Sequence, residues 1–242
     1  MVVVALLMLL LAWPSVGQAH DEAKPEVPTL TVTGAGHLAI APDTAFVTFG
    51  METAGRSLTE AHRRNNVVMK KVTERLLELH ISKERIQTSS FTVSPHYKPP
   101  PKQSADAPPV SPEIIGYTVS NTVTVEVSDP QQVAAVIEES LAAGANRFQG
   151  LQWALRDEQQ AKLGALKQAA AKAREKAAAL SETLKMKLLR LVSADEGGQV
   201  VRPSLRTARS MMAMDVGGEP PIFSGEMKVE AVVTLVYELA PE

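Results

Sequence analysis

The sequence predicts an α/β (α+β) sandwich with mixed β-sheets and three helices, in the order ββαββαβαββ. Stretches in which apolar and polar residues alternate recur along the chain, as half-buried strands require. Between them lie three segments that begin with helix-capping residues and carry apolar residues at spacings of three and four. The chain of 242 residues is 45% hydrophobic and 21% charged, so it can bury a substantial core.

Two strands and a helix open the predicted domain. Leu30 and Val32 alternate with polar residues in the first strand, and the residues from Ala45 to Met51 do so in the second. Ser57 and Glu60 have the spacing of a capping box, so we expect the first helix to begin there. Its predicted buried stripe comprises Leu58, Ala61, Asn65, Val68, Val72, Leu76 and Leu79.

Asn65 is the one polar member of this stripe. A buried amide needs hydrogen-bond partners, and we expect a bond from this helix to a strand, with Asn121 or a backbone group as the partner. This role is structural. Tyr117, Asn121 and Asp129 could together form a polar site, but helix capping accounts for Asp129 and strand packing for Tyr117.

The middle of the chain predicts two strands separated by a loop. Ser89 to Tyr97 is the first strand, with Phe91 and Val93 facing inward. Residues 98–113 contain six prolines, which cannot pair inside a sheet, so we expect a flexible loop there. The residues from Tyr117 to Val127 alternate without interruption, so one face of this strand is expected in the core and the other in water.

Two further helices are predicted after this strand. Asp129 and Pro130 form an N-cap and a first-turn proline, and the helix they start is expected to end before Gly144. A strand covers residues 148–156. Asp157 with Gln160 caps the longest helix, whose small alanines are expected to let it lie close to a sheet. Its predicted buried stripe is Leu163, Leu166, Ala170, Ala173, Ala177, Leu180 and Leu184.

The last part of the chain predicts two strands around a loop. Residues 188–192 are expected to form a short strand, residues 197–220 a loop rich in Met and Gly, and residues 226–239 the final strand. Near the start of the chain, Gly34 and Gly36 lack the third glycine of a dinucleotide-binding loop. They lie between strand-like residues, and we interpret them as a turn or bulge.

The first 19 residues predict a secretory signal peptide. The segment Val2 to Ala12 is uncharged and apolar, and Gly17 and Ala19 place small residues before a cleavage point. A retained anchor is the alternative, because no Lys or Arg precedes the apolar segment, although that segment is shorter than the ~20 residues of a spanning helix. We therefore expect residues 20–28 to be a flexible lead, residues 29–240 to form the domain, and the mature chain to be periplasmic with no transmembrane span.

Short stretches in a consistent order along most of the chain carry a family resemblance. They include Ile86-Gln87-Thr88, Ile115-Gly116-Tyr117, Gly144-Ala145-Asn146, Pro221-Ile222 and Gly225-Glu226. With these stretches the chain resembles the SIMPL-domain family, whose bacterial members include periplasmic immunogenic proteins and oxidative stress defence proteins. The resemblance implies an exported protein that forms large homo-oligomers, is associated with stress phenotypes and has no established activity. It carries over no catalytic residue.

Composition and motifs argue against several functions. The formal net charge of −2, without a long basic block, does not favour nucleic acid as a partner. The chain has no cysteine, which excludes disulfides, thiol nucleophiles and thiolate metal sites. None of the common hydrolase, zinc-protease or phosphate-loop motifs is present, so we expect neither a cofactor nor enzymatic activity. An enzyme whose site forms only in space is the third hypothesis.

Histidines and methionines provide the remaining candidates for chemistry. His62 and His80 are about five helical turns apart, too far to share a metal, and we expect solvated or capping roles for them. His37 and His96 lie on strands that could be neighbours, so a shared metal is an open alternative. Two sets of residues are candidate copper ligands, namely His20 at the new N-terminus after cleavage and the thioethers of Met211, Met212 and Met214. Adaptable packing is the structural interpretation of those methionines.

The function that we expect is structural. The principal hypothesis is a self-assembling periplasmic protein associated with envelope or oxidative stress defence, with exposed strand edges and the Ala-rich helix supplying the contacts between copies. Peripheral envelope contacts are possible for such a protein. The alternative hypothesis is a periplasmic binding module for copper or a small ligand.

Overall fold

The computed structural model describes residues 27–99, 111–204 and 222–242. The elements follow the predicted order ββαββαβαββ, which is confirmed, with two short 3-10 turns added. The strands are β1 (Thr29–Ile40), β2 (Thr44–Gly55), β3 (Ile86–Tyr97), β4 (Ile114–Val127), β5 (Arg147–Ala154), β6 (Met186–Ser204) and β7 (Glu226–Pro241). The helices are α1 (Leu58–Glu78), α2 (Val133–Ala142) and α3 (Glu158–Thr183), and the 3-10 turns are η1 (Lys83–Arg85) and η2 (Pro130–Gln132).

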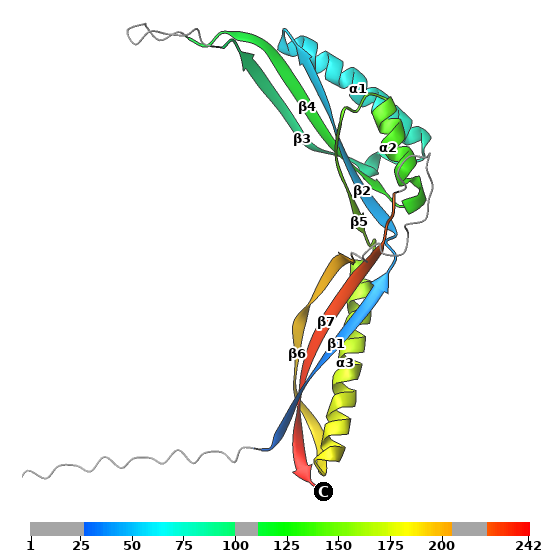
Figure 1. Ribbon diagram of the computed structural model, residues 1–242, viewed down its shortest axis with the longest axis vertical. Coiled ribbons are helices and arrows are strands. Elements are labelled where there is room, and N and C mark those ends of the chain that lie inside the picture. The colour runs from blue at the N-terminus through cyan, green and yellow to red at the C-terminus, as the bar shows by residue number, and fades with distance from the viewer. Residues whose placement is uncertain (1–26, 100–110, 205–221) are drawn as a thin grey trace, which may run out of the picture.

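The strands form two separate sheets, and the two resulting lobes lie end to end (Figure 1). The first lobe has a sheet of order β3-β4-β2-β5, which α1 and α2 cover on one face. The second lobe has a sheet of order β1-β7-β6, which α3 covers on one face. In Figure 1 the three helices lie on the same side of the molecule. Each sheet therefore has a second face that no helix of the described residues covers.

Every strand pairing in the described part of the chain is antiparallel, so the predicted mixed pairing is wrong. The connections explain the difference. The first lobe contains two strand-helix-strand units, β2-α1-β3 and β4-α2-β5. In the sheet, β4 lies between β2 and β3, and β2 lies between β4 and β5. This is the split β-α-β arrangement of ferredoxin-like folds.

The core of the first lobe lies between its helices and its sheet. Alternate residues of β2 are buried there as predicted, namely Ala45, Val47, Phe49 and Met51. Along α1 the buried residues are Ala61, Asn65, Val72 and Leu76, which confirms the interior of the predicted stripe, whereas Leu58 is exposed. Strand β4 buries Val119, Val123, Val125 and Val127 on the same side, so one face of this strand is core as expected.

The predicted helix starts are confirmed. The Ser57 hydroxyl accepts the Glu60 N–H at 3.2 Å, and the Glu60 carboxylate accepts the Arg56 N–H at 3.2 Å. Asp129 accepts the Gln131 N–H at 3.0 Å, and Asp157 accepts the Gln160 N–H at 2.8 Å. The proline after Asp129 starts a 3-10 turn before α2, and Gly144, with a φ of 113°, follows the end of that helix.

Strand β3 differs from the prediction in burial. Phe91 is 49% exposed, and Val93 and Tyr97 are also exposed. Phe91 pairs directly with the core residue Asn121, so its side chain lies on the helix side of the sheet. The prediction of the face was therefore correct, but β3 is an outer strand and α1 packs on β2 and β4 instead.

The buried stripe predicted for α3 is confirmed at Ala173 and Ala177 but wrong at its leucines. The residues that face the sheet are Ala161, Ala165, Ala169, Ala173, Ala177 and Ser181, whereas Leu163, Leu180 and Leu184 are exposed. A leucine stripe at the same spacing looks equally apolar in the sequence, but the sheet approaches this helix too closely for leucine.

Gly34 and Gly36 cause this close approach, and their interpretation as a turn or bulge is wrong. Both lie in the regular part of β1, paired with Val233 and Ala231 of β7. A Cβ atom on Gly36 would lie 1.9 Å from the Ala165 carbonyl oxygen, and one on Gly34 would lie 2.1 Å from the Ala169 carbonyl oxygen. The helix backbone therefore rests directly on the two glycines, which leaves room only for alanine on the helix.

Strand β6 is much longer than predicted. It continues through residues 197–204, which were expected to begin a loop, because β7 provides a pairing partner along that whole length. Gly198, with a φ of 91°, lies where the register shifts between Glu196 and Gln199. A bulge thus lets the strand continue across the two glycines that appear in the sequence to end it.

Candidate functional site

The surfaces of interest are the strand edges, because the principal hypothesis requires contacts between copies. In the described residues the outer strands are β3 and β5 in one sheet and β1 and β6 in the other. An outer strand presents unpaired N–H and C=O groups that can pair with another chain, unless the protein blocks them. The four edges differ in how they are blocked.

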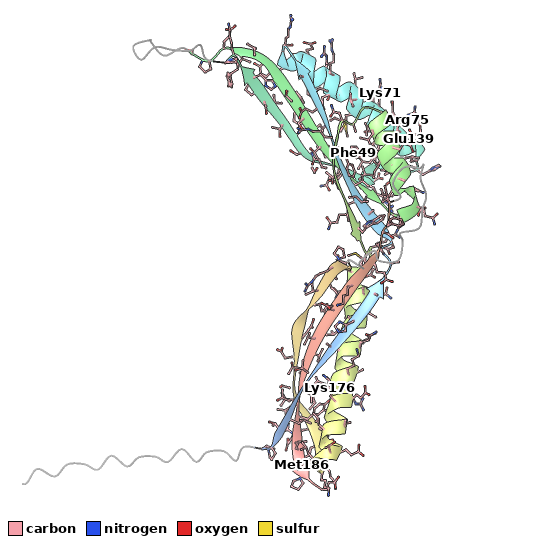
Figure 2. All side chains as sticks on the ribbon, viewed as in Figure 1. Phe49, Lys71, Arg75, Glu139, Lys176 and Met186 are labelled. Atoms are coloured by element: carbon pink, nitrogen blue, oxygen red, sulfur yellow. The ribbon has the colours of Figure 1, made fainter. Side chains whose placement is uncertain are left out.

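Side chains of α3 cap the free edge of β1. Lys176 donates to the Thr33 carbonyl oxygen at 2.8 Å, and the Gln168 side chain accepts the His37 N–H at 3.4 Å. Figure 2 shows Lys176 on the helix beside this strand. These bonds occupy two of the outward backbone groups, so another strand would have to displace them.

The two edges of the first lobe are blocked in other ways. Strand β3 contains Pro95, which has no N–H to donate to a new partner. Strand β5 has eight residues and a shift of register opposite Thr48, at Gly150. Short length and a bulge both weaken an edge as a template for pairing.

Strand β6 has the longest outer edge, although Pro203 and three shifts of register interrupt it. It spans 19 residues, and within the described ranges we find no side chain from another element that caps its outer backbone groups. Three large apolar side chains near the start of β6 are about half exposed; Met186, labelled in Figure 2, marks this end of the molecule. We call them the distal apolar patch: Leu189 (56%), Leu191 (48%) and Val192 (48%).

The Ala-rich face of α3 does not take part in this surface, which corrects the expectation that it supplies contacts between copies. Its alanines are buried against the sheet of the same chain. The leucines that the sequence placed in the core, Leu180 and Leu184, are exposed instead. The sequence signal for the patch is the nearly continuous apolar run Leu188, Leu189, Leu191 and Val192, because a half-buried strand would alternate.

The open face of the second sheet carries a small charged cluster. Glu230 lies 3.5 Å from the His37 ring and also contacts Lys228. The hydrogen bond from Lys228, together with the charges of Lys228, His37 and Arg202, holds the pKa of Glu230 below its usual value. His37 belongs to this cluster and lies in a different sheet from His96, so the predicted neighbourhood of the two histidines is wrong.

The other histidines have structural surroundings. His62 of α1 contacts Phe91 edge to face, with ring centroids 6.0 Å apart, and His96 forms a hydrogen bond of 2.5 Å with the Thr118 hydroxyl. His80 follows α1 with a φ of 63°, and the next residue donates to the Leu76 carbonyl oxygen at 3.0 Å, which fits the capping interpretation. Among the described residues, no three His, Cys, Asp or Glu side chains come together as metal ligands.

Asn65 is fully buried, and the predicted bond from helix to strand is confirmed. Its Nδ2 donates to the Met51 carbonyl oxygen of β2 at 2.8 Å and to the Val119 carbonyl oxygen of β4 at 3.3 Å. The backbone, not Asn121, is the partner. Tyr117 lies near the start of β4, and Asp129 follows the end of that strand as the cap before α2, so with Asn121 they do not form one polar site.

The copper candidates His20, Met211, Met212 and Met214 lie outside the described residues and stay predictions from the sequence. None of the helices in the described ranges combines the length and apolarity that a membrane crossing requires.

Comparison with known proteins defines the family. The family model for SIMPL, described as a protein of unknown function (DUF541), matches residues 30–237, which includes both lobes. The chain belongs to the SIMPL family. Among its relatives are the 26 kDa periplasmic immunogenic proteins of Brucella melitensis biotype 1 and Brucella abortus strain S19. Each is 28% identical over 214 residues, covering 87% of this chain and 84% of the relative.

Proposed function

We propose that this SIMPL-family protein is a periplasmic structural protein that assembles with copies of itself through β6 and the distal apolar patch. The observation that carries the proposal is a 19-residue outer strand with three half-exposed apolar side chains near its start. Proline and shifts of register occur in β6 as they do in β3 and β5, so its length and these side chains are what distinguish it from the other edges. The resemblance to a family of exported assemblies supports the same conclusion, as does the word periplasmic in the names of the relatives.

The apolar patch is large enough to matter energetically. Full burial of one leucine side chain contributes about 1.5–3 kcal/mol, and about half of that remains to be gained for a half-exposed one. Three such side chains on each of two copies offset part of the ~4–15 kcal/mol that association costs in lost freedom. Backbone hydrogen bonds between the β6 strands of two copies would fix their relative orientation, which apolar burial alone does not do.

A charge-introducing variant tests this proposal. We expect Leu189→Lys with Leu191→Lys to convert the multimer to a monomer, because the buried ammonium groups would lack partners. Size-exclusion chromatography with light scattering measures the mass directly. Leu77→Lys, at an exposed leucine of α1 in the other lobe, is the control and is expected to keep the wild-type mass. A multimer in the double variant would contradict a contact through β6.

The association with oxidative stress defence belongs to the same proposal. The test measures the survival of a deletion strain in peroxide after each variant is expressed in it. If assembly protects the envelope, the Leu77→Lys control is expected to restore survival. The monomeric double variant is expected not to restore it. Equal expression of both chains is checked by immunoblot. Full rescue by the monomer would show that the stress role does not depend on assembly.

A further inference from the structure

The open face of the first sheet is polar and carries few charges. Residues of β4 that alternate with its buried valines lie on this face, and those from Thr118 to Thr124 each pair with a hydroxyl residue on a neighbouring strand. Thr118 and Ser120 pair with Ser94 and Thr92 of β3, and Thr124 pairs with Thr48 of β2. The result is a flat array of hydroxyl groups, which explains why this face needs no covering helix.

A hollow of about 460 Å³ lies at one side of this array, where β5 is bulged. Gly150 has a φ of 154° and lies opposite Thr48, where the register between β2 and β5 shifts. A Cβ atom on Gly150 would meet nothing within 4 Å, so the space above it is open. Besides Gly150, the hollow is lined by Phe46, Thr48, Thr124, Gln149, Leu151 and Gln152.

Three of the polar side chains that line the hollow are held in place by hydrogen bonds. The Thr48 and Thr124 hydroxyl oxygens lie 3.1 Å apart, and Gln149 Nε2 donates to the Thr122 hydroxyl at 3.1 Å. Hydroxyl and amide groups both donate and accept hydrogen bonds, so they can pair with a ligand that does the same. Bulges commonly re-aim a side chain at a functional position, and here the bulge brings Gln149 onto the open face.

The lining also selects against charged ligands. None of the seven residues carries a charge, and Glu126 pairs directly with Phe46 on the same face. A phosphate or carboxylate group would therefore find no cation among the seven lining residues, and the nearby Arg147 is already paired with Glu52 at 3.0 Å. A contrasting hollow of about 740 Å³ lies at the start of α1 and contains Arg56, Arg64 and His96, but Arg64 is already bonded to Glu60 and to the Ala54 carbonyl oxygen.

We propose that the hollow at the β5 bulge binds a ring of an uncharged saccharide. The ring of Phe46 is partly exposed and offers an apolar surface for the C–H face of a sugar. The amides of Gln149 and Gln152 and the hydroxyls of Thr48 and Thr124 match the mixed donor and acceptor pattern of the sugar hydroxyls. The volume lies within the range of roughly 300–1,000 Å³ for small-molecule sites, and the hydroxyl array of β4 and β3 extends the surface for the next sugar units of a glycan.

Calorimetric titration of the mature protein with chitotriose, an uncharged trimer of N-acetylglucosamine, tests the proposal. We expect saturable binding that weakens at least about tenfold, equivalent to ~1.4 kcal/mol, in Phe46→Ala and in Gln149→Ala. Phe91→Ala, which removes an exposed ring from the opposite face of the same sheet, is expected to bind as the wild type does. Gln149 is exposed, so its variant keeps the test valid if Phe46→Ala unfolds.

Two outcomes would overturn the proposal. One is the absence of saturable binding to chitotriose and to two further uncharged trisaccharides, maltotriose and cellotriose. The other is binding that Gln149→Ala leaves unchanged, or that Phe91→Ala weakens as much as Phe46→Ala does. The oligomer contact through β6 lies in the other lobe, so the result is independent of the assembly proposal.

Discussion

Gly36→Ala is expected to destabilise the protein by about 3 kcal/mol, the upper end of the cost of overpacking a core. The added methyl group would lie 1.9 Å from the Ala165 carbonyl oxygen and 2.8 Å from the Ala169 nitrogen, both of which are helix backbone. A side chain can rotate away from such a clash, but a helix backbone can relieve it only by moving off the sheet. That movement would open the contacts of α3 with β1 and β7 along much of the second lobe. Thermal and urea unfolding of the purified protein measure the loss.

Gly197→Ala provides the matched control for this prediction. It makes the same chemical change in the same sheet, on β6, where the added methyl group would meet its nearest neighbours at 3.4 to 3.5 Å. That is ordinary contact, so we expect a change within about 0.5 kcal/mol. Equal stability of the two variants would contradict the view that β1 and α3 touch through their backbones.

Asn65→Leu is expected to lower the free energy of unfolding by about 2 kcal/mol. The change leaves the carbonyl oxygens of Met51 and Val119 without the donor that now reaches both, and an unsatisfied buried polar group costs about 1–3 kcal/mol. Part of that loss is offset, because Asn65 Oδ1 is itself buried without a hydrogen-bond partner and the leucine removes it. Unfolding in urea, followed by circular dichroism, gives the difference in free energy.

Asn66→Leu is the control for Asn65→Leu. Asn66 is the next residue of α1 and is exposed, so the same substitution there is expected to change stability by less than about 0.5 kcal/mol. A melting temperature of Asn65→Leu equal to or above that of the wild type would show that the amide does not tie α1 to β2 and β4.

Local signals made the order of elements predictable. Capping residues act within one turn of helix, so Ser57, Asp129 and Asp157 mark helix starts whatever the rest of the chain does. Alternation along β2 and β4 reflects one covered and one open face of the same sheet. The hydrogen bond from Asn65 to a strand was predictable because a single amide inside an apolar stripe must find a partner nearby.

Features that depend on distant parts of the chain were not predictable in the same way. Whether alanine or leucine faces the sheet in α3 is decided by Gly34 and Gly36, more than 120 residues earlier in the chain. The length of β6 depends on the length of β7, and the exposure of Phe91 depends on where α1 lies relative to β3. The saccharide hollow combines β2, β4 and a bulge in β5, and its residues have no motif in the sequence.

Native mass spectrometry of the mature protein, purified from the periplasmic fraction, tests the central claim most directly. We predict a defined mass that is a whole multiple of the protomer mass, with no metal or organic molecule required to hold it together. A protomer mass alone, at the concentration at which the protein is purified, would contradict self-assembly through β6.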